Sequence, residues 1–184
     1  MKKLPPYLLG FMLAAAVSLP RASGQQAQPS GRVGVYDSRV IAYVQFSTQA
    51  SRQQRDRQGA EALLAKETGH LALATRLSAD LAADQARIHL EVFSTAPASE
   101  ALAELQNRRP DLCAALGVAR LVSKWDDGAL SQVPPGQRVD VTDALVHEFV
   151  AQPDAQLVAI LRAIQAAKPL PLLEAKAQTL IGIE

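Results

Sequence analysis

The stretch Arg32-Val-Gly-Val-Tyr-Asp-Ser-Arg-Val40 decides how this chain folds. Val33 to Tyr36 is a short run rich in β-forming residues, and Asp37-Ser38 follows it directly. Asp and Ser side chains accept hydrogen bonds from the unpaired N–H groups at the start of a helix. Apolar residues then recur at helical spacing, at Val40, Ile41 and Val44. The segment therefore predicts a strand, a cap and a helix, in that order.

Two more short strands are predicted far downstream. Val118 to Trp125 alternates partly between apolar and polar residues, and Arg138-Val-Asp-Val141 is a second β-rich run. The residues between them, 126–137, contain Gly and Pro and predict a loop. Because short strands need partners, we expect the strands at 33–36, 118–125 and 138–141 to share one sheet.

The chain from Gln49 to Phe93 is predicted to be helical, because it lacks proline and is rich in strong helix formers. A short apolar stripe (Ala60, Leu63, Leu64) is followed by a longer one (Leu73, Leu77, Leu81, Ile88, Val92). Gly69 lies between the two stripes and readily adopts a left-handed conformation. Either the chain turns there and two helices pack as a hairpin, or one long helix runs through the glycine. We favour the hairpin, since it covers the apolar stripe.

Further helices are predicted on both sides of the later strands. Pro97 and Glu100 suit a first helical turn, Gly117 ends a short helix, and Pro153-Asp154 opens a helix over 155–167. The expected fold class is α+β, mainly helical: a small β-sheet body with a protruding antiparallel α-helical hairpin.

The N-terminal residues have the pattern of an export signal. Lys2 and Lys3 precede the apolar stretch Tyr7 to Leu19, and small residues follow at Ala22-Ser23-Gly24. Thirteen apolar residues are too few for a membrane span, and no cysteine follows that would carry a lipid. We expect a cleavable signal peptide at 1–24, a flexible leader at 25–31, and a periplasmic or secreted protein that is not a lipoprotein.

The charge composition of the chain limits the kinds of macromolecule that it can bind. The first 24 positions hold three of the 19 basic residues and none of the acidic ones, so the remainder has 16 basic and 18 acidic residues, a net charge of −2. A nucleic-acid binder needs an excess of Lys and Arg, so none is expected. Cys113 is the only cysteine, which excludes an internal disulfide, and we expect it to pack as a small buried side chain.

The order of these segments resembles the Skp/OmpH family of periplasmic chaperones. The likeness covers about 32–150 and rests on Val33-Gly-Val-Tyr-Asp-Ser-Arg-Val40 at one end and Val139-Asp-Val-Thr-Asp-Ala-Leu-Val146 at the other. Between them come a helical arm, a helix ending at Leu116-Gly117, and the strand Ala119-Arg-Leu-Val-Ser-Lys124. The family forms trimers whose arms hold unfolded outer-membrane proteins. The arm here, about 49–93, has six basic and six acidic residues, whereas the family's arms are basic.

The resemblance implies a holdase that binds non-native envelope or outer-membrane polypeptides, in a homo-oligomer, possibly a trimer. We expect client contacts at Leu73, Leu77, Leu81 and Ile88. Tyr36, Val122 and Trp125 are candidates for the oligomer interface, because aromatic residues anchor subunit contacts, although packing within one subunit would also account for them. The family-like domain spans 32–150, and 151–184 adds a C-terminal helix and tail.

We expect no catalytic residue, metal or cofactor. His70, His89 and His147 lack metal-ligand spacing, and Asp37, Asp140 and Asp143 are explained as helix starts. The chain contains no glycine-rich nucleotide motif or paired Cys-x-x-Cys. Two alternatives to the holdase stay open: an interaction module for one folded envelope partner, and a hydrolase that would use Ser38, Ser123 or His147.

Overall fold

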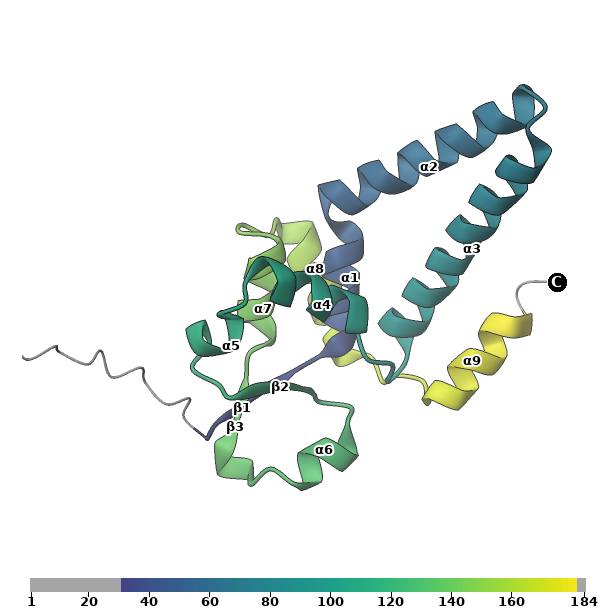
Figure 1. Ribbon diagram of the computed structural model, residues 1–184. Coiled ribbons are helices and arrows are strands. Elements are labelled where there is room, and N and C mark those ends of the chain that lie inside the picture. The colour runs from purple at the N-terminus through teal and green to yellow at the C-terminus, as the bar shows by residue number, and fades with distance from the viewer. Residues whose placement is uncertain (1–30, 182–184) are drawn as a thin grey trace, which may run out of the picture.

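The computed structural model describes residues 31–181, with side chains through residue 177 (Figure 1). The expected signal peptide (1–24) and all of the expected leader except Gly31 lie outside the described residues. No helix within the described range is long and apolar enough to cross a membrane. The elements in chain order are β1 (Val33–Tyr36), α1 (Ser38–Ser47), α2 (Gln49–Glu67), α3 (Leu71–Phe93), α4 (Ser99–Arg108), α5 (Leu112–Ala115), β2 (Arg120–Ser123), α6 (Asp127–Ser131), the 3-10 helix η1 (Pro135–Gln137), β3 (Arg138–Asp140), α7 (Thr142–Phe149), α8 (Ala155–Ala166) and α9 (Leu172–Ile181).

The three strands meet in one parallel sheet, in the order β2-β1-β3. β1 is central, and Val33 lies opposite Arg120 of β2. Gly34 lets the neighbouring side chains approach the middle of the sheet closely. A Cβ atom at this position would lie 2.9 Å from Leu121 Cδ2 and 3.0 Å from Val141 Cγ2. The three strands thus share one sheet, as predicted from the sequence. Glycine is needed at position 34 because a larger residue would collide with the side chains packed beside it.

The expected fold class is wrong in its antiparallel helical hairpin, as described below; the protein is mainly helical, and its small parallel sheet has strands of only four, four and three residues. Parallel neighbours cannot be joined by tight turns, so each connection between them has to cross over. The crossovers are helical: α1 to α5 lie between β1 and β2, and α6 and η1 lie between β2 and β3. Helices therefore make up most of the body as well as the projection from it.

Helix α1 forms the centre of the core. Asp37 is its N-cap, as predicted, and Asp37 Oδ1 accepts a hydrogen bond from the Arg39 N–H at 3.1 Å. Val40, Ile41 and Val44 have no exposed surface, and they belong to a cluster with buried residues of α3, α4, α7 and α8. Each fully buried aliphatic side chain contributes roughly 1.5–3 kcal/mol, so α1 is a main source of stability.

Helices α2 and α3 form an arm that projects from the body (Figure 1). The chain breaks between α1 and α2 at Thr48, which has an extended backbone and caps α2 by accepting a hydrogen bond from the Ser51 N–H at 3.2 Å. The turn at Gly69 is confirmed: its φ is +78°, and the His70 N–H reaches back to the Ala65 carbonyl at 2.8 Å.

The expected antiparallel hairpin of two packed helices is nevertheless wrong. The two helices meet near the turn and diverge towards the body as the arms of a V (Figure 1). Only small side chains are buried along the contact near the turn: Ala62, Ala65 and Ala74. The first ten residues of α2, 49–58, include one apolar side chain, Ala50, so this half of α2 has nothing to bury against α3. Polar residues of both helices line the space between them instead.

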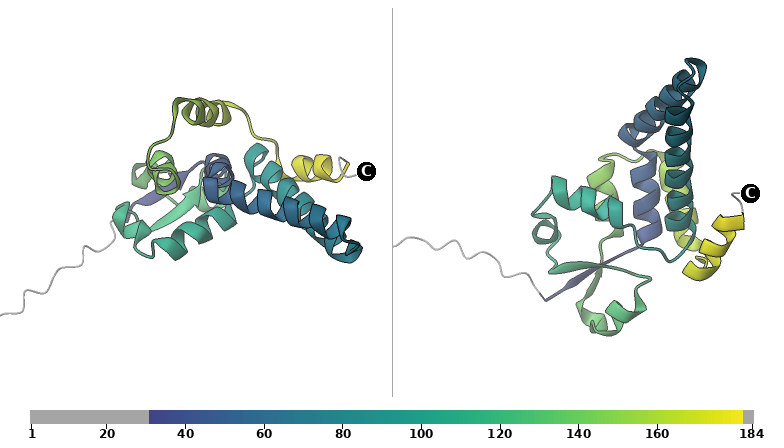
Figure 2. Two further views of the ribbon diagram at one scale, coloured as in Figure 1. Left: turned by 90° about the horizontal axis from the view of Figure 1, so that it is seen from above. Right: turned by 45° about the vertical axis from the view of Figure 1, so that its right-hand side comes forward.

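The C-terminal segment returns to the base of the arm. Figure 2 shows α8 set apart from α9 and joined to it by an extended connection. In that connection Leu170 pairs with Ser94 as an isolated parallel bridge, just beyond the end of α3. The Leu170 N–H donates to the Phe93 carbonyl at 2.9 Å, and the Thr95 N–H donates to the Leu170 carbonyl at 3.2 Å. Two backbone hydrogen bonds therefore fix the C-terminal segment to the foot of α3.

Candidate functional site

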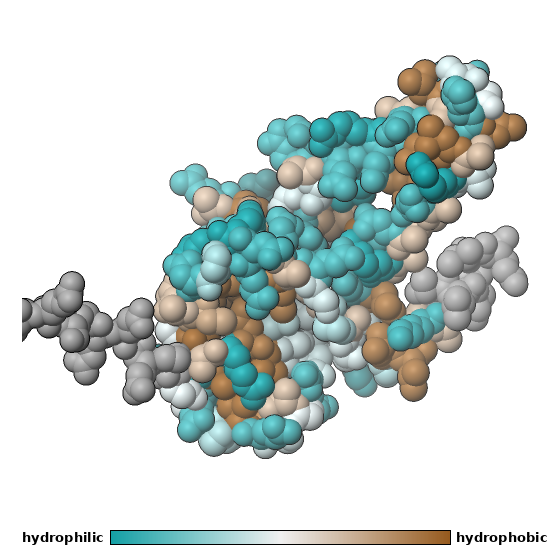
Figure 3. Space-filling model, viewed as in Figure 1, coloured by the Kyte–Doolittle hydropathy of each residue, from teal (hydrophilic) through white to brown (hydrophobic). Residues whose placement is uncertain are grey.

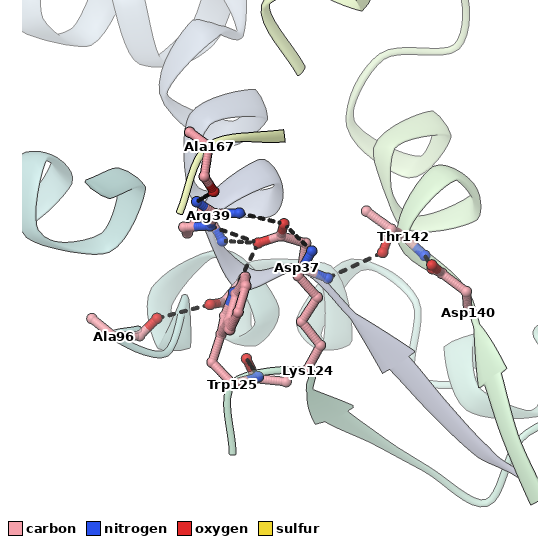
Figure 4. Close-up of polar contacts among 10 residues, drawn as sticks. Asp37, Arg39, Ala96, Lys124, Trp125, Asp140, Thr142 and Ala167 are labelled. Atoms are coloured by element: carbon pink, nitrogen blue, oxygen red, sulfur yellow. Dashed lines mark hydrogen bonds and ion pairs between the residues drawn. The ribbon is translucent and has the colours of Figure 1, made fainter. Parts of the chain in front are cut away.

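A buried polar cluster lies at the carboxyl end of β1 and consists of Asp37, Arg39, Lys124 and Trp125 (Figure 4). Arg39 donates to both carboxylate oxygens of Asp37, through Nε to Oδ1 at 3.2 Å and through Nη2 to Oδ2 at 3.1 Å. Lys124 Nζ lies 2.6 Å from Oδ2, and Trp125 Nε1 donates to Oδ1 at 3.0 Å. Asp37 and Arg39 are only 1% and 2% exposed. Both carboxylate oxygens are therefore fully occupied by donors from this chain.

The Asp37 cluster also links segments that are far apart in the sequence. The Asp37 N–H donates to Thr142 Oγ1 at 3.0 Å, which attaches the start of α7. Arg39 Nη1 donates to the Ala167 carbonyl at 2.8 Å, which attaches the chain just after α8. Trp125, after β2, holds Arg39 against its ring with 4.7 Å between the guanidinium carbon and the ring centre. The cluster thus joins β1, β2, α7 and the C-terminal segment.

The charge state of Asp37 follows from these contacts. Burial alone raises the pKa of the carboxyl group, but hydrogen bonds from Arg39, Lys124 and Trp125 outweigh burial and hold the pKa below its ordinary value. The carboxylate is therefore ionised at neutral pH. The carboxyl ends of parallel strands are a common location for catalytic groups, yet here the carboxylate is committed to holding the fold together.

The candidates for an oligomer interface lie inside one subunit. Tyr36 and Val122 are 4% and 5% exposed. Burial, with a smaller effect from the charge of Asp126, raises the pKa of Tyr36 to about 12. Trp125 is half-buried against the Asp37 cluster. The structure therefore brings Tyr36 and Trp125 to the end of the sheet, but it does not present Tyr36 or Val122 to a second subunit.

Ser38, Ser123 and His147, the candidates for a hydrolase, do not hydrogen-bond to one another. The Ser38 hydroxyl is buried and donates to the Ala96 carbonyl at 2.8 Å. Ser123 Oγ accepts from the Trp125 N–H at 3.3 Å, and His147 Nδ1 lies 3.2 Å from the Ala151 carbonyl. Each of the three polar groups contacts backbone. Within the described part of the chain, no group of three or more His, Cys, Asp or Glu residues could hold a metal ion.

An apolar groove lies at the base of the arm and has a volume of about 590 Å³. We call it the base groove; its apolar lining comes from α1, α3 and α8 and comprises Tyr43, Phe46, Leu81, Ile88, Val92, Phe93, Ile160 and Ile164. Its polar lining is limited to Arg55, Gln85 and His89. Of the predicted client contacts, Leu81 and Ile88 lie in this groove, although Ile88 is 7% exposed. Leu73 and Leu77 are half-buried farther along the arm and do not line it.

A second apolar surface lies at the end of the arm, beside the turn. Leu63, Leu64 and Leu71 are 58%, 60% and 64% exposed, and we call them the tip leucines. Figure 3 shows hydrophobic residues gathered there, beyond the polar surface of the rest of the arm. The sequence pattern placed Leu63 and Leu64 on a packing stripe. The structure instead packs α2 on α3 through Ala62 and Ala65, which turns both leucines outward.

Comparison with known proteins finds no match: no family model, curated protein or solved structure corresponds to this chain.

Proposed function

We propose that this protein is a non-enzymatic periplasmic holdase of the Skp/OmpH type, which binds non-native envelope polypeptides at the tip of its arm. The observation that carries the proposal is the exposure of the tip leucines. Each of the three residues is more than half exposed to solvent. Contiguous apolar patches of this kind on a soluble protein mark sites of interaction.

The surroundings of the tip leucines suit a partner without a fixed shape. The arm carries six basic and six acidic residues, so it does not select clients by net charge. Leucine side chains make dispersion contacts that are individually weak and non-directional. Such a surface gains affinity from many different apolar segments and demands no defined hydrogen-bond pattern. An unfolded β-barrel protein, which alternates apolar and polar residues, offers this kind of segment.

The test is suppression of aggregation. Protein lacking residues 1–24 is mixed in several-fold excess with a β-barrel protein diluted from urea, and light scattering is followed. We expect the wild type to suppress scattering and the triple variant Leu63→Gln/Leu64→Gln/Leu71→Gln to lose more than half of that effect, because the apolar contact area is removed.

The matched control is Leu173→Gln, which changes a leucine that is 83% exposed on α9, away from the tip. It should suppress aggregation as the wild type does, and circular dichroism should show the same fold for all three proteins. A wild type without suppression, or a triple variant with full suppression, would overturn the proposal. Recovery of one folded partner at fixed stoichiometry would favour the interaction module instead.

We further expect the protein to self-associate, as a trimer by resemblance to the family. β2 and β3 are the edges of the sheet, and each pairs with β1 alone among the described strands. Open edges of short sheets tend to be paired or covered. Tyr36 and Val122 are buried, so we expect the contact between subunits to use the sheet edges and not these side chains. Light scattering coupled to gel filtration should give about three times the monomer mass, and a strict monomer would contradict this expectation.

A further inference from the structure

The base groove is lined mostly by apolar side chains, and its hydrogen-bonding groups are limited to the side chains of Tyr43, Arg55, Gln85 and His89. Its walls are the helices α1, α3 and α8, whose backbone groups are engaged in their own helical ladders. An extended peptide placed there would bury N–H and C=O groups without partners, at a substantial cost for each group.

One end of the base groove opens into a polar compartment of about 530 Å³. The two spaces share Tyr43, Phe46, Arg55 and Ile160 in their linings. Arg52 lines the polar compartment but not the base groove. The base groove therefore has an apolar end and an end that carries guanidinium groups.

The two guanidinium groups are not neutralised by ion pairs. Arg55 Nη2 donates to the Phe46 carbonyl at 3.0 Å, with its guanidinium carbon 3.8 Å from the centre of the Phe46 ring. Arg52 Nε donates to the Ser47 carbonyl at 2.9 Å. Neither arginine forms an ion pair with a carboxylate among the described residues.

Of the carboxylates near the two arginines, Asp84 and Asp154 have other partners, whereas Asp80, which lines a polar space with Arg55, forms no ion pair among the described residues. Asp84, which acts on Arg55 through its charge, is paired with Arg87. Asp154, the acidic residue of the polar compartment, caps α8 by accepting from the Leu157 N–H at 2.7 Å. Asp56 also acts on Arg55 through its charge, but it is exposed and does not line either space. Each of the two arginines therefore keeps its positive charge free of an ion pair while donating to a backbone carbonyl.

We propose that the base groove binds a single-chain anionic amphiphile, with the acyl chain against Leu81, Ile160 and Ile164 and a carboxylate head at Arg55. An acyl chain has no polar groups to leave unsatisfied, and cavities of 300–1,000 Å³ are typical of small-molecule sites. A carboxylate accepts charge-assisted hydrogen bonds from a guanidinium. The site lies at the base of the arm and is separate from the tip leucines, so it does not rest on the proposed function.

The experiment measures binding of laurate by calorimetry, below its critical micelle concentration, to protein lacking residues 1–24. We expect one saturable site and about tenfold weaker binding of dodecanol, which has the same chain length without the charge. Arg55→Gln should abolish the preference for laurate over dodecanol. Arg57→Gln, an equal loss of charge at an exposed position on α2 outside the groove, should keep it.

A second variant tests the acyl-chain end. Ile164→Trp places a larger apolar side chain in the groove and should weaken laurate and dodecanol together by at least tenfold, with circular dichroism unchanged. Absence of saturable laurate binding would overturn the proposal, as would equal effects of Arg55→Gln and Arg57→Gln. If Ile164→Trp does not fold, the comparison of the two arginine variants decides alone.

Discussion

Replacing Asp37 by asparagine is expected to lower the free energy of unfolding by about 3–5 kcal/mol. The substitution keeps the shape of the side chain but removes the charge that Arg39 and Lys124 face. Arg39 is 2% exposed, so its guanidinium would remain buried without a counter-charge. Urea denaturation followed by circular dichroism measures the loss.

Two substitutions serve as controls for this prediction. Asp143→Asn removes an exposed carboxylate in the first turn of α7 and should cost less than about 1 kcal/mol. Lys124 is the more exposed partner of Asp37, with 32% of its side chain exposed. Lys124→Met should lower the free energy of unfolding less than Asp37→Asn does, because Arg39 still pairs with the carboxylate. A cost for Asp37→Asn no larger than that of Asp143→Asn would show that the cluster is not a source of stability.

Asp37 also gives the stability of the protein a defined dependence on pH. Its pKa is lower in the folded protein than the ordinary value of 3.8. The stabilisation is therefore fully present above the unfolded-state pKa and is lost as the pH falls through the folded-state pKa. As the pH falls below about 5, the free energy of unfolding of the wild type should decrease more steeply than that of Asp37→Asn. Parallel curves for the two proteins would contradict the assignment.

Replacing Arg87 by methionine is expected to cost about 3 kcal/mol at pH 7. Arg87 connects three carboxylates at the base of α3: Asp84, Glu91 at 2.9 Å and Glu100 at 3.2 Å. Glu91 is 8% exposed in its side chain, so removal of the arginine leaves a buried negative charge beside two others. Thermal and urea unfolding of Arg87→Met measure the cost.

The pKa of Glu91 supplies the test that separates this mechanism from simple loss of packing. Burial raises the pKa of Glu91, the charge of Arg87 lowers it, and the net effect is a raised value. An acid with a raised folded-state pKa favours folding when protonated, so its penalty disappears as the pH falls through that pKa. The deficit of Arg87→Met should therefore shrink on acidification. It should also shrink in Arg87→Met/Glu91→Gln, and a deficit independent of pH and of Glu91 would contradict the mechanism.

Local patterns in the sequence were enough to locate the strands and the cap. Asp37 follows a β-rich run and precedes helical spacing, and Gly69 separates two apolar stripes; both positions have the structure these signals predict. Each signal is encoded within a few residues of the element it defines. The family resemblance, the holdase activity and the export signal stay predictions.

The parts that the sequence did not predict depend on distant contacts. Trp125 lies 88 positions from Asp37, and Ala167 lies 128 positions from Arg39, so no local pattern brings them together. The V shape of the arm was missed because Leu63 and Leu64 satisfy the helical spacing for packing, whereas alanines permit a closer approach near the turn. The sequence does not predict the base groove, because Phe46 and Ile160 come from α1 and α8, which precede and follow the arm in the chain.

The two feet of the arm are attached in different ways, and this makes the arm mechanically asymmetric. The foot of α3 is anchored by its bridge to Leu170 and by the ion pairs of Arg87, whereas α2 follows the extended residue Thr48 and contacts α1 through Arg52 and Arg55. Because α3 contacts the rest of the protein more extensively than α2 does, we expect bending of the arm to be concentrated near Thr48. Because Arg55 is carried by α2, such bending would widen or narrow the entrance where an amphiphile's head group sits.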